Sequence, residues 1–84
     1  MNHVIVYVQP FLLEQEIAVY KEGQCVKTQK CTMENIDSLC YSLCKEFNIH
    51  QIDLAGPPSY IEKVKEDILL KTDFDSYDIN VSLY

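Results

Sequence analysis

Residues 3–9 have the sequence His-Val-Ile-Val-Tyr-Val-Gln and are followed by Pro10. Valine, isoleucine and tyrosine favour a β-strand, and proline ends it because its nitrogen has no hydrogen to donate to a neighbouring strand. Apolar side chains occupy both the even and the odd positions. That pattern is typical of a strand covered on both faces in the middle of a sheet. We therefore expect this strand to be central, with the rest of the chain arranged around it.

Two more strands are predicted directly after it. Residues 16–22 carry apolar side chains at both parities, and Gly23 can take the positive φ of a tight turn that follows them. Residues 24–31 form a more polar run with two lysines. Charged side chains suit an edge strand because they discourage pairing with another chain. The three runs predict an antiparallel meander.

A helix is predicted next, because the spacing of apolar residues changes from two to about 3.6. Thr32 is the expected N-cap, and Asn48 ends the segment. The apolar stripe of this helix consists of Ile36, Leu39, Leu43 and Phe47.

The remainder of the chain predicts a strand, a helix and a final strand. Residues 51–56 form a short apolar run that ends in glycine. Ser59 and Glu62 fit a capping box, in which each side chain satisfies a free backbone N–H at a helix start, and this second helix is expected to run to about Lys71. Residues 77–83 alternate between apolar and polar side chains, which predicts a half-exposed strand.

The whole chain, residues 1–84, is expected to form a single α+β domain. Its order is strand, strand, strand, helix, strand, helix, strand. We predict a five-stranded mixed sheet with the spatial order third, second, first, fourth, fifth. Right-handed crossovers would then place both helices on one face of the sheet and leave the other face bare.

Charge and composition restrict the function. Thirteen acidic residues against seven lysines give a net charge of −6, and the chain has no arginine. A nucleic-acid-binding surface needs clustered cations, so we expect no nucleic-acid partner. No apolar run is long enough to span a membrane and no leader is recognisable, so we expect a cytoplasmic protein without a membrane partner. An arginine-free chain of this kind is typical of accessory proteins of phages and mobile elements in AT-rich genomes.

The four cysteines are predicted to be free thiols. Cys40 and Cys44 stand four residues apart on the first predicted helix, which is half of a possible metal site. Cys25 and Cys31 would lie roughly 20 Å apart on one extended strand, too far to complete a tetrahedral site. A metal or redox site remains an alternative, and no cofactor is predicted.

The order of elements, with the sequence Ile-Asp-Leu-Ala-Gly at residues 52–56 leading into a helix, resembles the core of the ribonuclease H-like superfamily. The resemblance implies converging carboxylates that hold divalent metals, with Asp53 in the fourth strand and Glu34 or Asp37 from the first helix. The first strand contains no carboxylate, which is a departure from the family's pattern. The resemblance therefore implies the topology without the usual activity, and a degenerate metal-dependent nuclease using Asp53 is the alternative function.

The bare face of the sheet is the main candidate for function. If the helices cover the face that carries Val4, the opposite face presents apolar side chains, and an exposed apolar patch on a small protein usually marks an interface. The candidate interface residues are Ile5, Tyr7, Ala18, Tyr20 and Tyr84. Alternatively, these are partly exposed sheet residues over which residues 11–13 fold. We expect a small, acidic, non-catalytic protein-binding module, an adaptor or inhibitor, that contacts a protein partner or a second copy.

Overall fold

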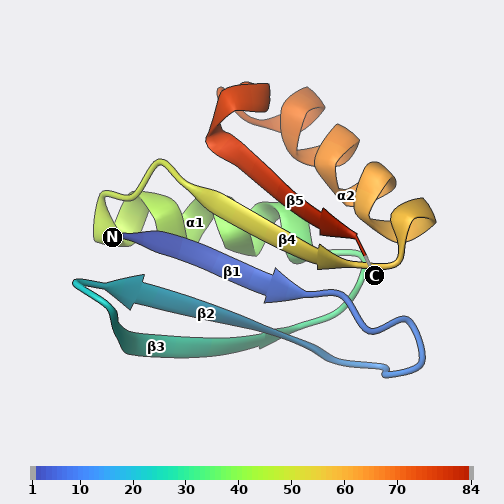
Figure 1. Cartoon of the computed structure of the whole chain (residues 1–84), viewed down its shortest axis with the longest axis horizontal. Helices are drawn as coiled ribbons and strands as arrows, with labels where there is room; N and C mark the ends of the chain where they lie inside the picture. Colours follow the sequence, from blue (N-terminus) through green and yellow to red (C-terminus); the bar gives the residue numbers. More distant parts are fainter. Residues whose placement is uncertain (1, 84) are drawn as a thin grey trace.

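The computed structural model describes residues 2–83 and confirms the predicted order of elements. Figure 1 shows one sheet with two α-helices. The elements are β1 (His3–Tyr7), β2 (Gln15–Lys21), β3 (Gln24–Cys31), α1 (Ile36–Phe47), β4 (Ile52–Gly56), α2 (Pro58–Lys71), the 3-10 helix η1 (Ser76–Asp78) and β5 (Ile79–Leu83).

The sheet has the order β3-β2-β1-β4-β5, which is the predicted one. Strand β1 pairs antiparallel with β2 and parallel with β4, and β2 and β4 pair in turn with β3 and β5. Ile5 of β1 lies opposite Ala18 of β2 on one side and opposite Asp53 of β4 on the other. The first strand is therefore central, and the fold is a mixed α+β sheet as expected.

The hydrophobic core lies between one face of the sheet and the two helices, which contact each other. Val4 and Val6 of β1 are fully buried there, whereas Tyr7 on the opposite face is 50% exposed. The expectation that β1 is covered on both faces is wrong, because both crossover helices pack on the same side (Figure 1). We call the uncovered side the open face.

Helix α1 begins later than the sequence predicted. Its N-cap is Asn35, without a side-chain capping bond, so the expected cap at Thr32 is wrong. A turn intervenes instead, in which the backbone N–H and hydroxyl of Thr32 donate to the Asn35 side-chain oxygen at 2.8 and 3.1 Å. Thr32 and Asn35 therefore stabilise the turn that precedes the helix.

Helix α2 begins earlier than predicted, and the capping box at Ser59 and Glu62 is wrong. Pro58 is the first helical residue, which places Ser59 inside the first turn. Proline suits that position because its φ is already helical and its missing N–H would have no helical partner. A capping box does form at Asp75 and Asp78 around η1, and β5 therefore starts two residues later than expected.

Gly56 allows the ends of β1 and β4 to approach closely. Its φ is +152°, and a Cβ atom there would lie 2.7 Å from the carbonyl oxygen of Val8. The Val8 N–H donates to the carbonyl oxygen of Ala55 at 2.7 Å. This contact fixes where the chain leaves β1 to form the loop beside the open face.

Candidate functional site

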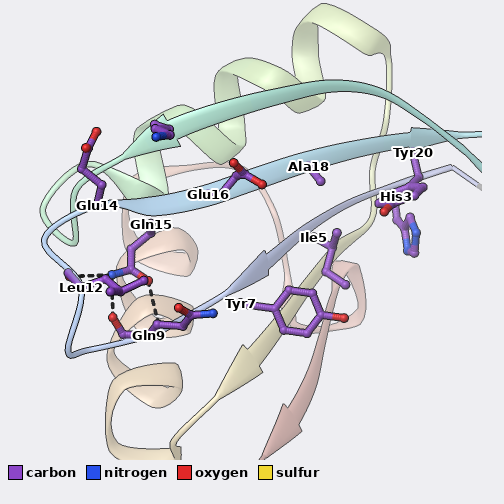
Figure 2. Close-up of a pocket in the computed structure, with 11 residues that line it drawn as sticks. His3, Ile5, Tyr7, Gln9, Leu12, Glu14, Gln15, Glu16, Ala18 and Tyr20 are labelled. Carbon is purple, nitrogen blue, oxygen red and sulfur yellow. Dashed lines mark hydrogen bonds between the residues drawn. The ribbon is translucent and has the colours of Figure 1, made fainter.

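A groove of about 610 Å³ runs over β1 and β2 on the open face (Figure 2). Ile5 and Ala18 lie directly opposite each other on its floor. Ala18 has the smallest side chain in the lining, and we call the part of the groove over it the hollow. At one end His3 packs edge-to-face against Tyr20, with ring centroids 5.4 Å apart, and Tyr7 lines the groove further along β1. The groove therefore has an apolar floor with aromatic walls.

A polar cluster centred on Asp53 holds the His3 ring in place. The Oδ2 atom of Asp53 contacts His3 Nδ1. Its Oδ1 atom accepts hydrogen bonds from the side-chain amides of Asn80, at 3.2 Å, and Gln51, at 3.3 Å. Three strands thus contribute to one network, and its effect is to fix the aromatic wall formed by His3 and Tyr20.

The loop between β1 and β2 forms the other end of the groove. Gln15 is buried, and its side chain accepts from Gln9 N at 2.6 Å and donates to the carbonyl oxygens of Gln9 and Leu12 at 2.8 and 3.0 Å (Figure 2). Leu12 lines the groove, while Phe11 and Leu13 are 97% and 93% exposed. The loop is therefore fixed beside the open face and does not fold over its tyrosines.

Two carboxylates stand at the loop end of the groove. Glu14 and Glu16 are exposed and line it, with Lys30 of β3 in register with Glu16. Within residues 2–83, neither glutamate takes part in an ion pair. Both remain able to pair with an incoming cation.

The groove brings together four of the predicted interface residues, namely Ile5, Tyr7, Ala18 and Tyr20. The fifth, Tyr84, lies outside the described residues. Sequence reasoning missed the contribution of His3, because its partner Asp53 belongs to a strand fifty residues away. It also missed Gln15, although this residue has the same strand parity as the buried Ile17.

The carboxylates suggested for a metal site do not converge. Asp53 lies on the open face, whereas Asp37 of α1 is buried on the helix side and pairs with Lys71, whose Nζ is 3.0 Å from Asp37 Oδ2. Glu34 is exposed in the turn before α1. Among the described residues, no group of three or more histidine, cysteine, aspartate or glutamate side chains could hold a metal ion.

The four cysteines are free thiols, as the sequence predicted. Cys25 is exposed, and the other three are buried. Burial raises the pKa of the Cys44 thiol to about 12 and holds the pKa of the Cys40 thiol well above its usual range. Protonated thiols are poor nucleophiles. Cys40 and Cys44 are buried in the hydrophobic core, where they pack as small apolar side chains.

In the part of the chain that the structure describes, no helix has the length and apolar character needed to cross a membrane.

No protein-family model matches the sequence, and neither does any curated protein. The fold is similar to part of the crystal structure of Pelota from Archaeoglobus fulgidus, with a TM-score of 0.66 and 8% sequence identity. The match covers 99% of this chain but only 26% of the Pelota chain. At this identity the similarity is one of fold alone.

Proposed function

We propose that this protein is a non-catalytic protein-binding module, an adaptor or inhibitor, that acts through its open sheet face. The observation that carries the proposal is the uncovered groove with Ile5 and Ala18 on its floor and Tyr7 and Tyr20 in its walls. Tyrosine suits an interface because its ring packs against a partner while its hydroxyl stays hydrated.

The adjoining loop enlarges this surface. Phe11 and Leu13 are almost fully exposed next to the groove. Contiguous apolar surface of this kind is uncommon on a protein that binds nothing, because each exposed Å² forgoes about 25 cal/mol of burial. The loop and the groove together therefore support a contact surface.

The topology is interpreted as that of a ribonuclease H-like domain without its chemistry. The strand order and the fold similarity to part of Pelota support this interpretation. A nuclease would need converging metal ligands, and both carboxylate oxygens of Asp53 are already engaged by neighbouring side chains. We therefore propose binding in place of catalysis. The free thiols fit a reducing compartment such as the cytoplasm.

Site-specific photo-crosslinking in cells of the source organism tests the proposal. The photoreactive residue p-benzoylphenylalanine replaces Tyr7 on the open face or, as a matched control, Tyr60 on α2, which are 50% and 42% exposed. We expect a defined adduct, with another protein or with a second copy, from position 7 only. In the position 7 protein, Ala18→Arg should abolish the adduct because the new side chain fills the hollow. Equal adducts from both positions, or none from position 7, would refute the proposal.

A further inference from the structure

The charges around the groove indicate what kind of partner it takes. Glu14 and Glu16 lie at its loop end without ion-pair partners among residues 2–83, and Lys30 is the one lysine in the lining. The whole chain carries a net charge of −6. The resulting negative electrostatic potential attracts cationic partners and speeds their association.

The geometry of β2 sets the distance between the apolar floor of the groove and this negative charge. Ala18 and Glu16 are two residues apart on one strand, so their side chains point to the same face about 7 Å apart. An extended peptide has the same repeat between alternate side chains. A peptide lying along β2 could therefore place one apolar side chain over Ala18 while its alternate neighbour reaches Glu16.

We propose that the occupant of the groove is an extended, cationic segment of a partner protein, an inference that rests on the proposed function. An apolar side chain of the segment fills the hollow over Ala18 between Ile5 and Tyr20. A lysine or arginine two residues away pairs with Glu16, and a further cation pairs with Glu14. The exposed Phe11 and Leu13 lie next to this segment and extend the apolar contact.

A second copy of the chain fits the groove less well. It would bring another net charge of −6, and the carboxylates of its own groove would meet those of the first copy. Like charges placed opposite each other across an interface disfavour association. Charge complementarity therefore selects a cationic partner over self-association.

Titration of the full chain with capped synthetic peptides, followed by amide chemical shifts, tests the inference. The probes are peptides of equal length that repeat Leu-Ser-Lys-Ser, Ser-Ser-Lys-Ser or Leu-Ser-Glu-Ser, so that leucine or serine and the charged residue stand two positions apart on one face. We call them the Lys-Leu, Lys-Ser and Glu-Leu peptides. We expect the Lys-Leu peptide to bind most tightly, to shift the amides around Ala18, and to weaken with added salt. Glu16→Gln should weaken its binding about 3-fold and the double variant with Glu14→Gln about 10-fold, as for exposed ion pairs. Glu62→Gln, on the exposed side of α2, is the matched control and should have no effect.

Two substitutions separate the hollow from the charge. Ala18→Arg should abolish binding of the Lys-Leu peptide, whereas Thr28→Arg should only weaken it, because Thr28 lies opposite Ala18 on β3 but outside the groove. No binding by any peptide, or equal binding of the Glu-Leu peptide, overturns the cationic segment. Shifts of the open-face amides with protein concentration alone would reveal a second copy, which overturns the inference but retains an open-face interface. The crosslinking from position 7 decides the proposed function separately.

Discussion

Gly56→Ala should be among the most destabilising single-methyl changes in this protein. The added Cβ would stand 2.7 Å from the Val8 carbonyl oxygen and 3.2 Å from Val8 Cβ. The oxygen belongs to backbone, which cannot swing away as a flexible side chain could. The residue would also keep a φ of +152°, a region that side chains rarely adopt.

The size of the effect follows from two contributions. A non-glycine residue in this backbone region costs about 2 kcal/mol. Moving Val8 away would also weaken its 2.7 Å hydrogen bond to Ala55, which is worth about 1 kcal/mol. The free energy of unfolding should therefore fall by about 3 kcal/mol, a large share of the roughly 4–13 kcal/mol expected for a domain of this size.

Urea denaturation of Gly56→Ala and Gly23→Ala measures the effect against a matched control. Gly23 also has a positive φ, of +78°, but an added Cβ there meets no atom within 4 Å. Its substitution should cost only the backbone strain, about 1 kcal/mol. If the two variants lose the same free energy of unfolding, the close approach between β4 and the end of β1 is not what requires glycine at position 56.

Three further predictions concern the loop and the thiols. Gln15→Ala removes three partly buried hydrogen bonds, so limited proteolysis should cut the β1–β2 loop faster than in the parent, and an unchanged rate would contradict its anchoring role. In the unfolded chain the Cys44 thiol ionises above pH 9.0, whereas in the folded protein its pKa is about 12. Between these two pH values the free energy of unfolding should therefore fall by about 1.4 kcal/mol per pH unit for this thiol. Cys44→Ala should make the fall less steep, and equal slopes would count against the raised pKa. Mass spectrometry after brief alkylation of the native protein should find Cys25 modified, with the buried thiols reacting only in denaturant.

The sheet could be predicted because its strands depend on local patterns. The bounds of β3 agree with the sequence prediction, and the right-handedness of crossovers, applied to the predicted strand order, correctly placed both helices on one face. The predicted start of α2 was wrong because serine and proline both favour the beginning of a helix. A serine three residues before a glutamate resembles a capping box, but Pro58 already occupies the first helical position and moves Ser59 inside the helix.

The candidate site was predictable only where strand parity determines it. Alternation alone places Ile5 and Tyr7 on the face opposite Val4, and the structure agrees. The contact between His3 and Asp53 depends on the register between β1 and β4. No local pattern specifies that register, because the two strands are joined through β2, β3 and α1.

The contrast between strands of the same sheet is the strongest link from fold to function. Strand β3, at the edge of the sheet, presents the polar side chains of Thr28 and Lys30 on the open face. On the same face, β1 and β2 carry Ile5, Tyr7 and Ala18. Both helices are committed to the other face, so nothing in residues 2–83 covers these apolar side chains. A sheet face that needed only to be hydrated would continue the composition of β3, and the change at β2 therefore supports our proposal that a partner binds at this surface.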